Sequence, residues 1–169
     1  MRKTNYILLI CLVWCGLSAC ESTPEPAKVY TFDTFCQFSD FPAKGTSVGD
    51  IEKWKQKHQT RVALEGYLNL PTMFGLASTT FGLDLTQEPG GNRKEAVTVY
   101  FKLGSGKNKL KTPPKQYKPD DLEAYDLNGN KVTNKTKVRV HGQRSLVNSL
   151  ENDKVQSCFI NVDRVEIIQ

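Results

Sequence analysis

Residues 136–146, TKVRVHGQRSL, decide the fold class, because apolar and polar side chains alternate through them. This period of two is typical of a β-strand that buries one of its faces. Four more stretches alternate in the same way: RVALEGYLNL (61–70), STTFGLDLT (78–86), AVTVYFKLG (96–104) and FINVDRVEII (159–168). Five strands separated by turn signals predict an all-β barrel or sandwich rather than βαβ units.

Two glycines favour a small barrel. Gly66 and Gly142 stand inside the first and the fourth predicted strand. A glycine within a strand lets the chain bend sharply, as it must at the corner of a small barrel. The sequence therefore predicts a mainly β fold, with a five-stranded barrel over residues 60–169.

The connection between the third and the fourth strand predicts an inserted β-hairpin. It begins with a basic, proline-bearing loop, GSGKNKLKTPPKQYKP (104–119). The stretch DLEAYDLNGNKV (121–132) then offers two short strands joined at Asn128-Gly129, a strong hairpin signal.

Residues 29–59 predict an N-terminal extension with a short helix. Phenylalanines recur at every third position of VYTFDTFCQFSDF (29–41) and could form a stacking platform or pack against the domain. Because most aromatic area is spent on burial, we expect two or three of these rings to pack. The stretch GTSVGDIEKWKQKHQT (45–60) predicts a helix capped by Asp50, with Ile51 and Trp54 on its apolar face.

The start of the chain has the features of an export signal. Arg2 and Lys3 are followed by an apolar stretch (6–17) that is too short to span a bilayer core of about 30 Å. Small residues then stand where a signal peptide is cleaved. The run Leu17-Ser18-Ala19-Cys20 closely resembles the lipobox of bacterial lipoproteins.

The lipobox resemblance implies that residues 1–19 are removed and that Cys20 carries a diacylglyceryl group. Two or more acyl chains hold a protein stably at a membrane. Glu21, rather than Asp, follows the cysteine, so the resemblance implies the outer membrane, at its periplasmic face or at the cell surface. Residues 20–28 contain Pro24 and Pro26, and we expect them to form a flexible tether.

The mature chain from Cys20 onward is nearly neutral. Without Arg2 and Lys3, the 23 basic residues become 21 against 18 acidic residues, a formal charge of +3. Such a charge does not by itself point to nucleic acid. Apart from Cys20, this chain keeps Cys36 and Cys158, in a compartment that permits disulfides. The two can pair or remain separate buried thiols, and the sequence does not show whether they approach.

The barrel region (60–168) resembles the OB-fold, in particular the group described as tRNA-anticodon-binding-like. The resemblance rests on Gly66 towards the end of the first strand, on the run Val138-Arg139-Val140-His141-Gly142, and on Cys158 in the closing strand. It implies an OB-like five-stranded barrel. The chain departs from the pattern where an OB-fold commonly carries a helix, because the third connection here predicts a loop and a hairpin. Many secreted members of this group have no assigned nucleic-acid role, so the family label does not give a function.

The sequence offers no catalytic constellation, cofactor site or metal site. The mature chain has only His58 and His141 as histidines, and neither has a second histidine or a cysteine close in sequence to form a metal site. His141 follows Arg139 at an outward position of its strand, so we expect it to face solvent. No Gly-x-Ser-x-Gly elbow is present, and Gly104-Ser105-Gly106-Lys107 lacks the spacing of a phosphate-binding loop.

These observations predict a non-enzymatic, membrane-anchored module that binds an envelope protein, peptide or glycan. The alternatives are a single-stranded nucleic-acid binder and a purely structural envelope component. We expect the binding surface to comprise Tyr67, Tyr100, Lys102, Lys107, Lys109, Lys111, Arg139, His141 and Arg144. The sequence does not identify the partner, the membrane face or the oligomeric state.

Overall fold

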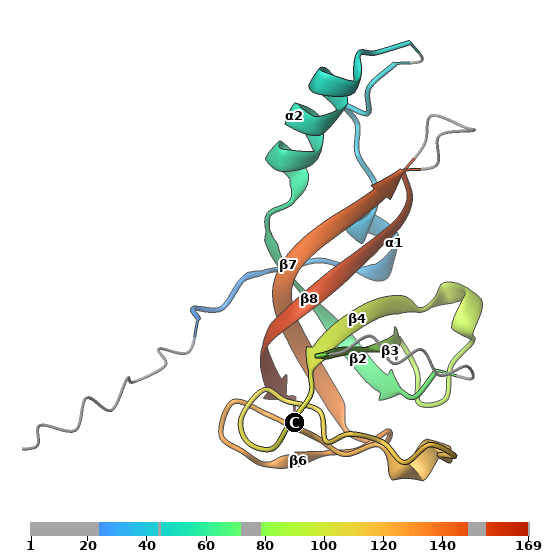
Figure 1. The fold of residues 1–169 in the computed structure, drawn as a ribbon, viewed down its shortest axis with the longest axis vertical. Coiled ribbons are helices and arrows are strands. Elements are labelled where there is room, and N and C mark those ends of the chain that lie inside the picture. The colour runs from blue at the N-terminus through green and yellow to red at the C-terminus, as the bar shows by residue number, and fades with distance from the viewer. Residues whose placement is uncertain (1–23, 44, 72–78, 149–154, 169) are drawn as a thin grey trace, which may run out of the picture.

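The computed structural model describes residues 24–43, 45–71, 79–148 and 155–168 (Figure 1). The helices are α1 (Phe32–Phe35) and α2 (Val48–His58), with 3-10 turns η1 (Arg93–Glu95) and η2 (Pro119–Asp121). The strands are β1 (Lys28–Val29), β2 (Arg61–Asn69), β3 (Thr80–Thr86), β4 (Val97–Lys102), β5 (Ala124–Tyr125), β6 (Lys131–Val132), β7 (Lys137–Asn148) and β8 (Val155–Ile167). The expected signal peptide and Cys20 lie outside the described residues. Among the described helices, none has the length and apolar character needed to cross a bilayer.

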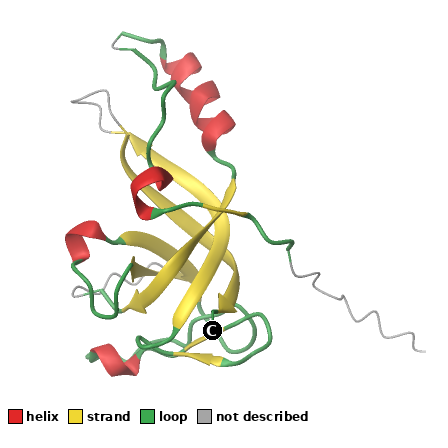
Figure 2. Ribbon diagram, turned by 180° about the vertical axis from the view of Figure 1, so that it is seen from behind, coloured by secondary structure: helices red, strands yellow, loops and turns green. Residues whose placement is uncertain are grey.

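Five strands close into a barrel. The order is β2-β3-β4-β8-β7, and β7 pairs back onto β2 from Arg61↔Gln143 to Tyr67↔Lys137. Within this ring β4 and β8 run parallel, while the other four pairings are antiparallel. The predicted five-stranded OB-like barrel is therefore confirmed, and Figure 2 shows the strands crossing steeply as they wrap around it.

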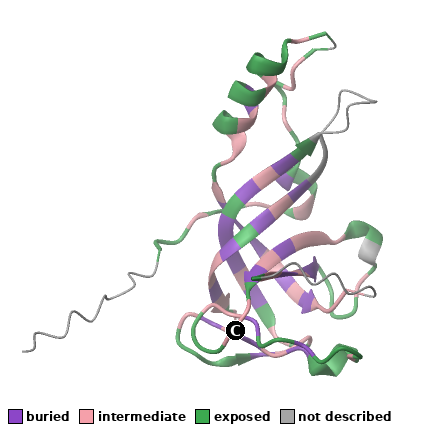
Figure 3. Ribbon diagram, in the orientation of Figure 1, coloured by how far each residue is buried: buried purple, intermediate pink, exposed green. Residues whose placement is uncertain are grey.

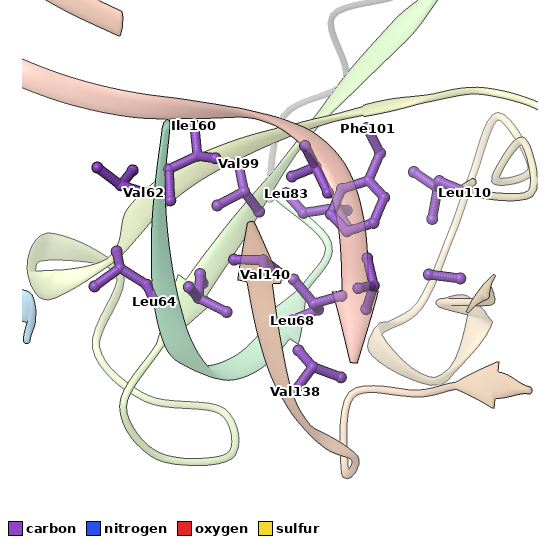
Figure 4. Packing of buried hydrophobic residues seen from close by; sticks show 14 of the residues in the cluster. Val62, Leu64, Leu68, Leu83, Val99, Phe101, Leu110, Val138, Val140 and Ile160 are labelled. Atoms are coloured by element: carbon purple, nitrogen blue, oxygen red, sulfur yellow. The ribbon is translucent and has the colours of Figure 1, made fainter. Parts of the chain in front are cut away.

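The barrel interior is filled by the alternate residues that the period of two selects. Figure 4 shows these side chains converging from all five strands, and Figure 3 shows buried residues alternating with less buried ones along them. The fully buried members include Val62, Leu64, Leu68, Leu83, Leu85, Val99, Phe101, Val138, Val140, Ile160 and Val165. Burying a side chain of this size stabilises a fold by about 1.5–3 kcal/mol, so this cluster is the main source of stability.

The segment between β4 and β7 covers one end of the barrel, where an OB-fold commonly carries a helix. Leu110 and Leu122 are buried there, together with Ala124 of β5 and Val132 of β6. The predicted hairpin is confirmed, with β5 and β6 joined by a turn in which Gly129 has φ +89°. The carboxylate of Asp126 accepts backbone N–H bonds from Asn128 and Asn130 and so holds that turn.

The N-terminal extension packs through its aromatic residues. Phe35 is buried, while Phe38 and Phe41 contact Trp54 of α2 edge-on at centroid distances of 5.0 and 5.1 Å. The expectation that two or three of these rings pack is therefore confirmed. The predicted cap of α2 is wrong: Ser47, not Asp50, is the N-cap, and its Oγ accepts the N–H of Asp50. The helix thus begins one turn earlier than expected.

A disulfide joins Cys36, directly after α1, to Cys158 of β8. The Cα atoms lie 5.9 Å apart, and the bond links positions separated by 122 residues in the sequence. A link of this span removes much of the freedom of the unfolded chain, worth about 4–5 kcal/mol in the loop-entropy model. It ties the extension to the barrel covalently.

Gly66 and Gly142 allow strands to approach more closely than any side chain would permit. A Cβ at Gly142 would lie 1.9 Å from the carbonyl oxygen of Asn161, and one at Gly66 would lie 2.3 Å from that of Thr86. Beside Gly142 the β7–β8 register shifts, because His141 faces Arg164 while Gly142 faces Val162. Asp163 is therefore an extra residue on β8, a bulge that bends the strand.

Replacing Gly142 with Ala is expected to destabilise the barrel by about 3 kcal/mol, because overpacking against a backbone oxygen forces strands apart. Urea unfolding of the chain from residue 21 onward measures the change. The matched control is Gly49→Ala in α2, where the added methyl meets nothing closer than 3.9 Å. That variant should gain up to about 1 kcal/mol from helix propensity. Equal unfolding midpoints for the two variants would contradict the close crossing at Gly142.

Candidate binding surfaces of the barrel

The nine residues predicted to form one binding surface lie in four different environments. Arg139 and His141 lie on the wall formed by β2, β7 and β8, and Arg144 lies beneath the N-terminal extension. Tyr100 and the four lysines lie on β4 and in the loop that follows it. Tyr67 is half-buried on β2, where its register neighbours are Thr86 and Lys137. The structure therefore does not bring the predicted set together.

Arg144 is a structural residue, which corrects its predicted role in binding. Its side chain is only 4% exposed and donates hydrogen bonds to the carbonyl oxygens of His58 (2.9 Å) and Phe35 (3.0 Å). The guanidinium also lies 4.9 Å from the ring centroid of Phe38. Burial lowers the pKa of Arg144. The extension covers Arg144 and accepts its hydrogen bonds. Arg144 therefore holds the extension in place and is not accessible to a partner.

His141 is fully buried, so the expectation that it faces solvent is wrong. Its outward position on β7 is as the alternation predicts, but residues 24–29 lie over it. Its Nδ1 accepts the backbone N–H of Ala27 at 3.0 Å. On the other side, Nε2 lies 3.4 Å from a carboxylate oxygen of Glu166 without hydrogen-bond geometry, so this contact is purely electrostatic. Burial of the ring lowers the pKa of His141, and the neighbouring Glu166 opposes that effect.

Two arginines beside His141 bind the same N-terminal segment through its backbone. Arg61 of β2 makes two hydrogen bonds to Asp163 (2.8 and 2.6 Å) and donates from its remaining nitrogen to the carbonyl of Glu25. Arg164 of β8 is held in the same way by Glu166 and donates to the carbonyl of Pro24 at 2.9 Å. We call Arg61, His141 and Arg164 the backbone clasp. Residues 24–28, predicted as part of a flexible tether, thus lie against the barrel.

The main chain beyond Ala27 continues this attachment. Strand β1 pairs in parallel with β2, and the N–H of Tyr30 donates to the carbonyl of Ala63 at 2.9 Å. Hydrogen bonds from charged donors contribute about 1.5–3 kcal/mol each, while ordering each residue costs about 1–2 kcal/mol. Ordering six residues therefore costs more than the two arginine bonds alone contribute, so the bonds of His141 and of the β1–β2 pairing are needed to hold the segment.

Arg139, predicted to contact a partner, is occupied by an ion-pair network that supports the clasp. Its guanidinium bonds Glu65 at 2.9 and 2.6 Å and approaches Glu166 at 3.4 Å. Glu65 raises the pKa of Arg139. Glu166 in turn orients Arg164. Arg139 therefore supports the clasp through Glu166 and does not present its charge to a ligand.

A second surface lies on the outer side of β3, β4 and β8, and we call it the aromatic face (Gly82, Thr98, Tyr100, Phe159 and Asn161). The rings of Tyr100 and Phe159 meet edge-on with centroids 5.0 Å apart. A Cβ at Gly82 would lie 3.2 Å from the Tyr100 ring, so the ring extends over that glycine. Both rings are half-buried, and the exposed Asn161 donates to the hydroxyl of Ser145.

Lys102, two residues after Tyr100 on the same side of β4, borders the aromatic face, while the other predicted lysines lie in the loop after β4. Lys102 ends β4 and, like Lys107, is exposed; in the described part of the chain no carboxylate pairs with Lys102, Lys107 or Lys109. Lys111 instead approaches Glu123 at 3.4 Å, beside Lys131 at 3.0 Å. The Tyr125 hydroxyl and these two lysines lower the pKa of Glu123 to about 2. Lys111 is therefore partly neutralised, while the other three keep their charge available.

Sequence reasoning missed Phe159, Gly82 and the two clasp arginines. The alternation of FINVDRVEII contained a signal for Phe159, since an aromatic side chain at an outward strand position is itself unusual. No comparable signal marked Arg61 or Arg164, because their backbone partners lie far away in the sequence. Within the described residues no group of three or more His, Cys, Asp or Glu side chains is placed to hold a metal ion.

Comparison with protein-family models, curated proteins and solved structures gives no match for this chain. The surfaces described above are therefore the basis for assigning a function.

Acidification is expected to loosen residues 24–29, because a protonated His141 Nδ1 cannot accept the N–H of Ala27. The pKa of His141 is lowered in the folded protein, so its contribution is complete above the ordinary value of 6.5 and is lost as the pH falls below it. The protection of the Ala27 amide against hydrogen exchange should therefore be lower at pH 5 than at pH 7.5.

The control for this experiment is His141→Gln, whose amide oxygen accepts a hydrogen bond at either pH. In this variant the protection of the Ala27 amide should change little with pH. Protection in the unmodified chain that is equally independent of pH would show that His141 does not control the attachment.

Proposed function

We propose that this chain is a lipid-anchored lipoprotein of the bacterial envelope whose OB-like barrel binds a protein, peptide or glycan partner without catalysis. The anchor is supported by the sequence from Arg2 to Cys20, which has the order and residue types of a lipoprotein signal. Two acyl chains would hold the mature protein at the membrane, with the outer membrane as the expected location.

The observation that supports the binding role best is the aromatic face. β3 and β4 are the second and third barrel strands, and OB-folds bind oligomeric ligands on this part of the barrel. An edge-on pair of half-buried rings beside open polar groups suits a ligand that has both apolar surfaces and hydrogen-bonding groups. Sugars and extended peptides share this combination.

The polar groups around the two rings favour a ligand without strong charge. Thr98, Ser145 and Asn161 supply hydroxyl and amide groups, while Lys102 and the largely buried Asp84, the register partner of Thr98, bring one charge of each sign. Hydroxyls and amides donate and accept hydrogen bonds, as sugar hydroxyls and peptide groups require. These residues therefore support a glycan or protein partner more than a polyanion.

A photo-cross-linking residue at Asn161 is expected to capture the partner in intact cells. Asn161 is exposed beside the two rings, so it should give higher yields than the same probe at Gln56, which is exposed on α2. Adding Tyr100→Ala should reduce the Asn161 yield about tenfold, since a central aromatic contact is commonly worth more than 1 kcal/mol. Equal yields at both positions, unaffected by Tyr100→Ala, would refute binding at the aromatic face.

Single-stranded nucleic-acid binding is the second candidate, and the unpaired Lys102, Lys107 and Lys109 favour it. Stacking rings next to a basic groove are what sequence-tolerant OB-folds use. Fluorescence anisotropy with labelled oligonucleotides at low and physiological salt separates the two proposals. For a glycan or protein binder we expect no micromolar binding at low salt. Binding that falls steeply with salt, and is lost in a Lys102→Gln, Lys107→Gln, Lys109→Gln variant, would favour nucleic acid instead.

A further inference from the structure

Three barrel strands each direct one side chain at the main chain of residues 24–27. Arg164 of β8 donates to the carbonyl of Pro24, Arg61 of β2 donates to that of Glu25, and His141 of β7 accepts the N–H of Ala27. All three contacts are to backbone groups, so the clasp binds an extended chain and does not depend on the side chains of the segment.

The clasp is pre-oriented by carboxylates. Asp163 fixes the guanidinium of Arg61, and Glu166 fixes that of Arg164, which leaves one nitrogen of each arginine free to reach the segment. Arg139 and Glu65 support Glu166 from behind. Charge-assisted pairs of this kind hold a guanidinium in one geometry, so the binding positions exist before the segment arrives.

The segment is suited to this site. Pro24 and Pro26 restrict the backbone to extended conformations, which lowers the entropy lost when the chain is bound. The attachment ends in β1, which adds a short parallel strand to β2. Because the segment lies next to the expected anchor at Cys20, its attachment to the barrel affects the distance between the barrel and the membrane.

We propose that the backbone clasp is a binding site for the protein's own N-terminal segment and sets the distance of the barrel from the membrane. This inference rests on the proposed lipid anchor. With Pro24 held, four Cα–Cα steps lead back to Cys20, a reach of at most about 14 Å. With the segment released, the chain is free as far as Thr31, where α1 and its buried Phe35 begin, which extends the reach to about 38 Å. The bound state keeps the barrel close to the lipid, and the packed extension limits how far the released barrel can move away.

Trypsin cleavage after Lys28 reports the state of the segment, because Lys28 lies in β1 and its backbone is paired with β2. Proteases cut an extended segment only when it has left its neighbours. The experiment uses the full lipidated protein in phosphatidylethanolamine–phosphatidylglycerol vesicles and follows the new N-terminus at Val29 by mass spectrometry.

The Arg61→Gln, Arg164→Gln double variant should be cleaved after Lys28 at least tenfold faster than the unmodified protein. Lys53→Gln is the control: it removes an exposed positive charge of α2 that pairs with Asp50 and lies outside the clasp network, and its rate should stay within about twofold. Ala27→Pro is the second variant, in case the double variant fails to fold, because it removes the N–H donated to His141 and alters only the segment. It should also be cleaved faster.

Energy transfer from a fluorescent amino acid at position 161 to labelled lipid measures the distance itself. Transfer should be lower in the double variant and in Ala27→Pro than in the unmodified protein and Lys53→Gln. Equal cleavage rates and equal transfer in all four proteins would overturn the proposal.

The lipid anchor is tested separately with Cys20→Ala, which should lose fatty-acid labelling and accumulate as unprocessed precursor, whereas Cys15→Ala should behave normally. Normal labelling and processing of the Cys20→Ala chain would disprove the anchor, and with it the effect on membrane distance. Unchanged cleavage in properly anchored variants would instead disprove the clasp, so the two failures are distinguishable.

Discussion

The close crossing of β7 and β8 at Gly142 is the constraint on which both surfaces of this protein depend. The carbonyl of Asn161 occupies the space where a side chain at position 142 would lie, and the two long strands bend together there. The bulge beside it inserts Asp163 into β8 and places two charged residues, Asp163 and Arg164, next to each other on the outside. A strand without this bulge would point one of them at the core, because side chains alternate between the two faces.

β8 connects the two surfaces. Its first part contributes Phe159 and Asn161 to the aromatic face through parallel pairing with β4. Its last part contributes Asp163, Arg164 and Glu166 to the clasp through antiparallel pairing with β7. The disulfide at Cys158 fixes the same strand to the extension. An attachment at the N-terminus and a ligand surface on the barrel are therefore built on one continuous element, which favours a fixed orientation of one relative to the other.

Two of the buried polar side chains, those of Arg144 and His141, hold the N-terminal extension. Arg144 donates hydrogen bonds to carbonyl oxygens of the extension, and His141 accepts the backbone N–H of Ala27 in the segment before the extension. Leaving either partner unsatisfied would cost about 1–3 kcal/mol, so removal of the extension would penalise the barrel itself. The extension is thus part of the folded unit.

The sequence by itself determined the strands, their inward faces and the corners of the barrel. The alternation from Val62 to Leu68 and from Val138 to Val140 identified core residues correctly, because strand periodicity is a local property. Gly66 and Gly142 were identifiable for the same reason, as was the hairpin at Asn128-Gly129. The proposed export signal and the proposed lipidation of Cys20 also rest on local residue order, and they lie outside the described structure.

Only the tertiary structure decided what covers the outward residues. Alternation placed His141 outside correctly, but it could not reveal that Ala27, 114 positions away, lies over it. Arg144 was predicted to be a surface cation, but the extension covers it. The approach of Cys36 to Cys158 depends on the same long-range packing. Burial of an outward side chain and the meeting of distant cysteines depend on chain segments that no local pattern relates. For this reason the structure confirmed the predicted fold but corrected the predicted binding residues.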